Sequence, residues 1–300
     1  MRWLVGGLCG LALLLTSALA LADLASALRD YEAGAYEAAA KEFDRLAQSG
    51  DVEARYWLGR CYDSGQGVAE DRVRAFELFE QAAKGGHDEA QRVVGIYLEE
   101  GLAGETDVAA AAGWYRKSAE QGNAKAMRNL GQLYADGAGV PRNYGRAADL
   151  FRQAAEQGNA KAMRNLGYLY YFGRGVAKDP GQAADYFQRA AESGLDRAAY
   201  NLGFVHYHGR GVPKDLELAA AHMTRAAESG DVDAQLFLAH LYLSGEGVEA
   251  DPEEAFFWAF LGSAQRPSLA AWYFDQLHDK LTEAQRERMR RRAHEWSPKG

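Results

Sequence analysis

Apolar residues recur along this chain at helical spacing, in short blocks that glycine-rich segments separate. Residues 126–134 place alanine, leucine, leucine and tyrosine at the i, i+4, i+7, i+8 spacing of a helix with one buried face. Residues 147–155 repeat that spacing with alanine, phenylalanine and two alanines. Between them lies DGAGVPRN, residues 136–143, whose glycines permit positive φ and whose proline cannot sit inside a helix. The pattern predicts a helical hairpin.

The hairpin recurs every 36 residues. The string AEQGNAKAMRNLG occurs at residues 119–131 and again, letter for letter, at residues 155–167. The same period is marked by Gly50, Gly86, Gly122, Gly158, Gly194 and Gly230, and by Ala54, Ala90, Ala126, Ala162, Ala198 and Ala234. A fixed period of this length predicts copies of one unit, each stacked on its neighbours, with a continuous core.

The second helix of each hairpin has recognisable ends. Short polar residues that suit an N-cap recur where it should begin: Asp71, Asp107, Asn143, Asp179, Asp215 and Asp251. Pro180 and Pro252 follow at the favoured first helical position. In the third repeat the helix should end at Gly158, with Asn159 capping the next helix. One position inside these helices predicts an aromatic spine of Phe79, Tyr115, Phe151 and Phe187.

The repeat, A-x-x-x-L-G-x-x-Y-x-x-G-x-G-V-x-x-D followed by A-x-x-x-[FY]-x-x-A-A-x-x-G, resembles the Sel-one-like repeat (SLR), a branch of the tetratricopeptide family. The resemblance covers six repeats over residues 52–266. It is weaker in the second repeat, where Gly104 replaces the loop valine, and in the sixth, where Ala239 replaces the glycine and Ala259 the aromatic residue. It implies an all-α fold, a right-handed α-solenoid of stacked helical hairpins.

The two ends of the array predict caps, which a solenoid needs to cover its terminal hydrophobic faces. Residues 23–51 match half a repeat and form the expected N-terminal cap, with a short helix over residues 23–33. Residues 267–300 form the expected C-terminal helical cap, with helices over 268–280 and 283–296. A capping box of Thr282 and Gln285 should open the last helix.

That last helix carries five arginines, which are Arg286, Arg288, Arg290, Arg291 and Arg292. They could form a site for an acidic partner. Because Glu283, Glu287 and Glu295 are interleaved with them, a solvated capping helix is the alternative that we favour.

The N-terminus predicts export. Arg2 is followed by an apolar run over residues 4–19 and by Ala20-Leu21-Ala22, an A-x-A cleavage site. Residues 1–22 are therefore expected to be a signal peptide that is removed before Asp23, and the alternative is an uncleaved anchor. Either version places the repeats outside the cytoplasm, in the periplasm or secreted. After cleavage we expect no membrane span.

Composition and charge limit the kinds of ligand and reaction that we expect for this protein. The net charge is −8, which argues against a nucleic-acid partner because phosphate needs basic surface. Cys61, the one cysteine left after cleavage, stands where other repeats have leucine or valine and should be a buried apolar residue. No catalytic motif, cofactor loop or metal-ligand spacing is present, and His206 and His208 point to different helix faces. We expect no enzyme activity, no cofactor and no metal.

One row of positions on the first helices faces away from the predicted core, and by analogy with tetratricopeptide arrays it lines a concave groove. In repeats three to five this row, with the lysines one turn earlier, gives the candidate partner-binding residues Lys125, Arg128, Lys161, Arg164, Tyr168, Tyr171, Phe172, Tyr200, Phe204, Tyr207 and His208. The first two repeats carry Asp63, Glu99 and Glu100 instead. Arginines beside aromatic rings suit a peptide or a glycan, although some of the tyrosines could simply pack on a neighbouring helix.

The resemblance implies a scaffold, since related exported SLR proteins act as regulators, assembly factors or host-contact factors. We expect an exported scaffold or regulator that acts in the cell envelope. Its groove should bind an acidic and apolar segment of a partner protein. That partner would belong to an envelope complex or be the extracytoplasmic domain of a sensor. The alternative is a cell-wall-active hydrolase or glycan-binding protein, because some secreted relatives are penicillin-binding. Those relatives have paired cysteines in each repeat, and this chain does not.

Overall fold

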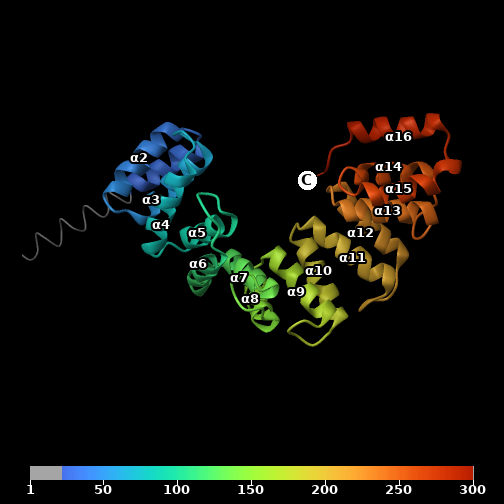
Figure 1. Ribbon diagram of the computed structural model, residues 1–300, viewed down its shortest axis with the longest axis horizontal. Helices are drawn as coiled ribbons and strands as arrows, with labels where there is room; N and C mark the ends of the chain where they lie inside the picture. The colour runs from blue at the N-terminus through green and yellow to red at the C-terminus, as the bar shows by residue number, and fades with distance from the viewer. Residues whose placement is uncertain (1–21, 300) are drawn as a thin grey trace, which may run out of the picture. The chain divides into compact units, whose positions relative to one another are not determined.

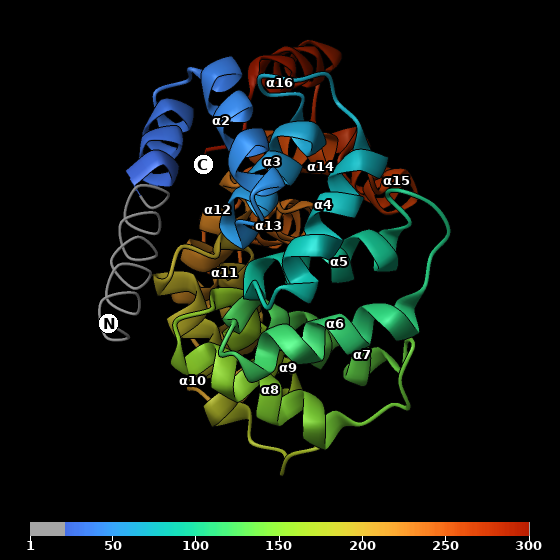
Figure 2. The same ribbon diagram turned by 90° about the vertical axis from the view of Figure 1, so that its left-hand side faces the viewer.

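The computed structural model describes residues 22–299, and over this range the chain is helical with no β-strand (Figure 1). It divides after Arg142 into an N-terminal unit and a C-terminal unit, each compact in itself. In the N-terminal unit, residues 22–32 are helical and precede α2 (Tyr36–Gln48), α3 (Val52–Ser64), α4 (Arg72–Lys84), α5 (Asp88–Glu100), α6 (Val108–Glu120) and α7 (Ala124–Asp136). Successive helices pack side by side, as the run from α4 to α6 illustrates (Figure 2).

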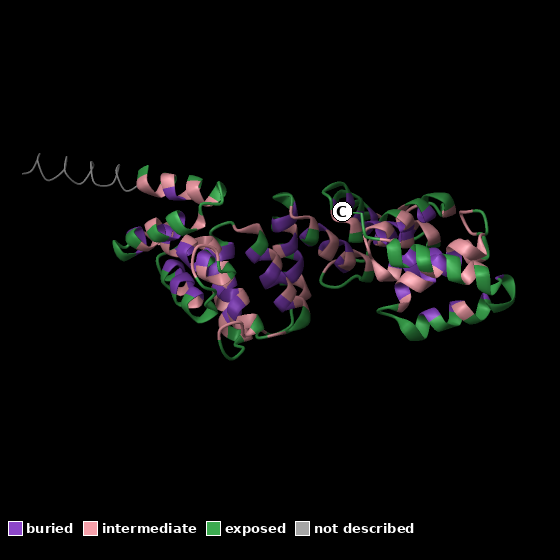
Figure 3. Ribbon diagram, turned by 90° about the horizontal axis from the view of Figure 1, so that it is seen from above, coloured by how far each residue is buried: buried purple, intermediate pink, exposed green. Residues whose placement is uncertain are grey.

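The C-terminal unit continues the same alternation of first and second helices. Its helices are α8 (Tyr144–Glu156), α9 (Ala160–Phe172), α10 (Pro180–Glu192), α11 (Asp196–His208), α12 (Leu216–Glu228), α13 (Val232–Ser244), α14 (Pro252–Ser263), α15 (Pro267–Gln276), the 3-10 turn η1 (His278–Lys280) and α16 (Glu283–Glu295). Within each unit the buried residues lie between the helices and the exposed ones on their outer surfaces (Figure 3). The all-α array of stacked hairpins is confirmed.

The predicted helix caps are confirmed as well. All six of the predicted N-cap side chains accept backbone N–H bonds of their helices. Asp179 Oδ1, for example, accepts from the amides of Gly181 and Gln182 at 3.0 Å, and Pro180 fills the first helical position. Asn159 caps α9 in the same way. These short polar side chains satisfy amides that the helix itself leaves free, which sets where each helix begins.

Close approach between the two helices of a hairpin depends on a glycine of the first helix. A Cβ at Gly59 would lie 2.8 Å from the Phe79 ring, and one at Gly167 would lie 2.6 Å from the Phe187 ring. The spine residues are at most 2% exposed, as predicted. In the sixth repeat an alanine replaces each member of this pair, and both alanines are fully buried, so the smaller spine residue leaves room for the added methyl group.

The segment expected to form the C-terminal cap packs against the sixth repeat. Helix α16 packs on α14 and opens with the predicted capping box of Thr282 and Gln285. Four of its five arginines bond to glutamates, and Arg288 and Arg292 reach across to Glu253 and Glu254 of α14. These contacts support the capping helix that the interleaved charges favoured.

Two further expectations concern Cys61 and the N-terminus. The Cys61 side chain is fully buried beside Phe43 and Leu58 in the N-terminal core, as predicted, and burial raises the pKa of its thiol to about 11.

The proposed signal peptide, by contrast, falls almost wholly in residues 1–21, outside the described residues. Among residues 22–299 no helix has the length and apolarity needed to cross a bilayer.

Candidate functional site

The candidate residues are divided between the two units. Lys125 and Arg128 lie on α7 in the N-terminal unit, and the other nine lie on α9 and α11 in the C-terminal unit. Helices α9 and α11 belong to neighbouring repeats and bring several of these side chains together around a hollow of about 180 Å³. The hollow is lined by Tyr168, Tyr171, Phe172, Phe187, Tyr200, Asn201, Phe204 and Val205.

The wall of this hollow is built from rings that support one another. Tyr168 packs edge-on against the buried spine residue Phe187, with 5.4 Å between ring centroids. Its hydroxyl accepts a 2.8 Å hydrogen bond from Asn201 Nδ2, which ties α9 to α11. Tyr171 lies edge-on to Phe172 at 4.9 Å and to Phe204 at 6.4 Å. Because each ring is held by a neighbour, the apolar surface is formed before anything binds to it.

Three arginines surround the rings. The guanidinium carbon of Arg164 lies 5.1 Å from the centre of the Tyr168 ring, and that of Arg174 lies 5.1 Å from the Phe172 ring. Arg210 lies 5.8 Å from both Tyr171 and Phe204, and donates to the Tyr171 hydroxyl. A guanidinium that stacks on an aromatic face keeps its N–H edge free for an acceptor.

Arg174 and Arg210 were not predicted from the sequence. Each stands between the two glycines of its loop, in the strings Gly173-Arg174-Gly175 and Gly209-Arg210-Gly211. Gly175 has a φ of 70°, and a Cβ there would lie 2.2 Å from the carbonyl carbon of Tyr144, so the loop packs directly on α8. The sequence did contain a clue to these two residues. In these two repeats an arginine stands between the paired loop glycines, where the third repeat has Ala138.

No carboxylate within residues 143–299 pairs with any of these three arginines. Elsewhere in the same unit arginines are paired, for example Arg152 with Asp149 at 2.8 Å and Arg225 with Asp196 at 2.8 Å. The hollow therefore combines an apolar floor with positive charge that the C-terminal unit does not neutralise. Phe172 at its edge is 53% exposed, which is unusual for so large an apolar side chain.

The remaining candidates on α11 lie beside the hollow. Tyr207 packs on Phe237 at 5.0 Å and donates to Glu246, and this hydrogen bond, with burial, raises its pKa to about 12. His208 lies 4.4 Å from Phe204, and burial together with two nearby cations lowers its pKa. Both residues extend the ring surface without lining the hollow. Lys161 is exposed on the first turn of α9.

In the N-terminal unit the same row has a different chemistry. The hydroxyl of Tyr115 donates to Glu99 at 2.6 Å, and that of Tyr97 donates to Asp63. Burial and these carboxylates raise the pKa of both tyrosines. Arg128 is half-buried, and burial lowers the pKa of its guanidinium.

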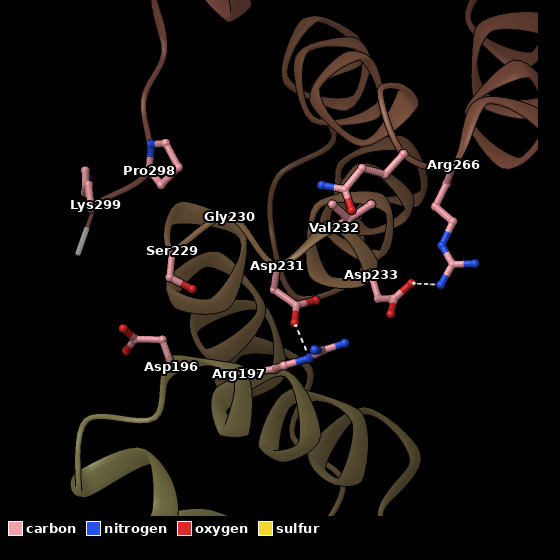
Figure 4. A pocket seen from close by; sticks show the side chains of 11 residues that line it. Asp196, Arg197, Ser229, Gly230, Asp231, Val232, Asp233, Arg266, Pro298 and Lys299 are labelled. Carbon is pink, nitrogen blue, oxygen red and sulfur yellow. Dashed lines mark ion pairs between the residues drawn. The ribbon is translucent and has the colours of Figure 1, made fainter. Parts of the chain in front are cut away.

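A larger hollow of about 500 Å³ lies at the N-terminal ends of α11 and α13 and under the C-terminal tail (Figure 4). Its arginines are paired: Arg197 with Asp231 at 3.2 Å and Arg266 with Asp233 at 3.5 Å. Asp231 also caps α13 by accepting from Ala234 N at 3.0 Å. The two ion pairs connect α11 to the start of α13 and α13 to the start of α15, so we assign these charges to holding neighbouring hairpins together.

Histidines and carboxylates do not gather into a metal site in the part of the chain that the structure describes, where no group of three possible ligands occurs. Two histidines do lie together: His206 of α11 stacks on His222 of α12 with 5.7 Å between centroids. Tyr170 and Tyr186 stack at the same separation in the preceding repeat. The histidine pair therefore occupies a packing position.

Comparison with known proteins identifies the repeat. The Sel1 repeat model matches six consecutive segments, residues 52–87, 88–123, 124–159, 160–195, 196–231 and 232–265. A Sel1 repeat protein from Oxalobacter formigenes is 31% identical, with a TM-score of 0.76 over 80% of this chain and 96% of its own. No curated protein matches the chain.

A second solved structure is a protective antigen present in uropathogenic Escherichia coli strains, which displays an SLR fold. It is 36% identical, with a TM-score of 0.83 over 87% of this chain. This chain spans 57% of the length of that antigen. With six matched repeats, two similar solved structures and hairpins packed in series, the chain belongs to the Sel1 repeat family.

Proposed function

We propose that this chain is an exported scaffold that binds a segment of a partner protein in the hollow between α9 and α11. Sel1 repeat proteins are generally non-enzymatic scaffolds for protein interactions. The observation that carries the proposal is the hollow itself, in which preformed rings and unpaired arginines lie on one face. Aromatic residues and arginine contribute most of the energy at protein interfaces, because they bury large areas or bond to carboxylates in pairs.

The chemistry of the hollow suggests the chemistry of the partner segment. Its apolar floor favours a large apolar side chain, since burying such a group against rings gains free energy without leaving polar atoms unpaired. The arginines around it favour carboxylates on either side of that group. An acidic and apolar segment fits both features, whereas a glycan would use the rings and leave the guanidinium groups without counter-ions.

The extracytoplasmic location rests on the N-terminal sequence and on one relative. Residues 1–22 have the composition of a signal peptide, with the expected cleavage before Asp23. A protective antigen present in uropathogenic Escherichia coli strains is among the similar solved structures, and we take this as support for an exported protein. We place the chain in the periplasm or among secreted proteins, as part of an envelope complex or bound to a sensor's extracytoplasmic domain. N-terminal sequencing of exported protein should begin at Asp23, and an intact Met1 would favour an anchor instead.

A binding experiment tests the hollow. The partner is isolated from an envelope extract on immobilised wild-type protein, and its binding is then measured with purified components. Phe204→Ala should weaken the binding, whereas Leu269→Ala, which removes a side chain that is 53% exposed on α15, should leave it unchanged. Full affinity of a folded Tyr168→Ala/Phe204→Ala variant would contradict the proposal. Binding of a glycan that these substitutions weaken would support the alternative.

A further inference from the structure

One position on the first helix is arginine in three successive repeats, as Arg92, Arg128 and Arg164. In the second repeat, a carboxylate of the same helix neutralises it. Arg92 Nε donates to Glu89 Oε2 at 2.9 Å and Arg92 Nη2 donates to Glu89 Oε1 at 2.7 Å. The guanidinium group and the carboxylate thus form the two parallel bonds that their shapes favour.

The residue that supplies this carboxylate changes in the next two repeats. Lys125 and Lys161 stand at the position of Glu89, three residues before the arginine. Residues three apart on a helix are neighbours, so these two arginines have a lysine at the position from which Glu89 neutralises Arg92. Among the described residues, the Nε atoms of Arg128 and Arg164 are buried and have no hydrogen-bond partner.

We infer that Arg164 binds a carboxylate of the partner in the bidentate position that Glu89 occupies on Arg92. The inference rests on the proposed function and assigns the acidic group of the partner to one arginine. A buried donor without an acceptor is unfavourable, and a carboxylate that reaches the same edge of the guanidinium removes that penalty. Lys161 adds attraction on approach. Arg128 in the N-terminal unit shares the buried Nε without a partner, but the carboxylate of Glu99 acts on its charge.

The position of Arg164 connects this site to the hollow. Its guanidinium group lies over the Tyr168 ring, with Nη2 3.5 Å from the Tyr168 hydroxyl, and Tyr168 lines the hollow. A carboxylate on Arg164 therefore belongs to a residue close in sequence to the one whose side chain enters the hollow. Because Nε is covered in the free protein, a side chain must move for the carboxylate to enter.

The substitution Lys161→Glu tests this directly, because it rebuilds the Glu89–Arg92 pair in the fourth repeat. The probes are two short fluorescein-labelled peptides, one with phenylalanine between glutamates and one with the glutamates replaced by glutamine. We expect Lys161→Glu to weaken binding of the glutamate peptide by about tenfold or more, and Lys161→Gln by only about two- to threefold. Binding of the glutamine peptide should hardly change. Lys41→Glu, an equal charge change on the exposed surface of α2, is the control and should have little effect.

A double-mutant cycle decides whether Arg164 is responsible. In an Arg164→Gln background, Lys161→Glu should have no more effect than Lys161→Gln, because the new glutamate has lost its partner. Equal losses for Lys161→Glu and Lys161→Gln in the otherwise wild-type protein would overturn the inference. Equal affinity of the wild-type protein for the two peptides would also overturn the inference. If Phe204→Ala still weakened binding in that case, the hollow would stand as the partner site. Failure of both peptides to bind would contradict the proposed function as well.

Discussion

The first helices of the N-terminal and C-terminal units present the same row of positions with opposite chemistry. On α3 and α5 the row carries Asp63 and Glu99, and each accepts a hydrogen bond from a tyrosine of its own unit. On α9 and α11 it carries rings with guanidinium groups over them, and within residues 143–299 no carboxylate pairs with those groups. The shared repeat pattern therefore fixes the direction in which a side chain at a given position points. The charge of that side chain differs from one repeat to the next. We expect the capacity to bind a partner to follow from which of these charges are left unpaired.

The largest expected effect falls on what the two units share. Phe79→Ala in the N-terminal unit and Phe187→Ala in the C-terminal unit should each lower the free energy of unfolding by about 3–5 kcal/mol, because both remove a buried ring. Urea unfolding followed by circular dichroism measures this. A loss below about 1 kcal/mol in one unit alone would show that the spines are not equivalent.

The second prediction concerns what the units do not share. Phe204→Ala should weaken partner binding by about 1–3 kcal/mol, because the ring forms part of the preformed hollow. The matched control is Ile96→Ala, at the equivalent position of α5, which should leave affinity unchanged. Titration calorimetry with the isolated partner measures both. Similar losses at the two positions would extend the binding surface to the N-terminal unit and break the comparison.

A smaller effect is expected at the loop arginines. Arg174→Gln combined with Arg210→Gln should slow association about two- to tenfold and make it less sensitive to salt, because these charges attract an acidic segment before contact. Stopped-flow measurements at several salt concentrations give the association rate. Arg152→Gln removes an arginine that already pairs with Asp149 and serves as the control. An unchanged salt dependence in the loop variant would mean that the partner approaches without these charges.

The smallest effect is a pH dependence confined to the fifth repeat. Burial, followed by the nearby His206 and Arg225, lowers the pKa of His222 below its ordinary value of 6.5. The unfolded chain then binds a proton more readily than the folded one, so the contribution of this group to stability is present above about pH 6.5 and falls as the pH drops below it.

A variant with His206→Tyr and His222→Tyr copies the stacked Tyr170–Tyr186 pair and should lose less stability on acidification than the wild type. Thermal melts at about pH 7 and about pH 5 compare the two proteins. An equal loss in both proteins would remove the histidine pair as a cause and direct attention to the carboxylates.

The sequence by itself determined the hairpin, its period, its caps and its spine. A short polar residue before each helix, a glycine opposite each aromatic ring and an apolar row at helical spacing are local signals. Each acts within one repeat or on its neighbour, so the stacking of repeats follows from them. The export signal is equally local, and it remains a prediction from residues 1–22. The sequence also nominated Tyr168, Phe204 and their neighbours, because a row on a helix can be read from spacing alone.

Only the tertiary structure decided which of those side chains form a surface. It separated the candidates, with Lys125 and Arg128 in one unit and the ring-lined hollow in the other. It brought in Arg174 and Arg210 from loops, since the direction of a loop side chain depends on how its glycines pack against the preceding repeat. It also distinguished Arg92, which has its own carboxylate, from Arg164, whose Nε has no partner among the described residues. Pairing of charges depends on distance in space, and a one-dimensional period does not contain that distance.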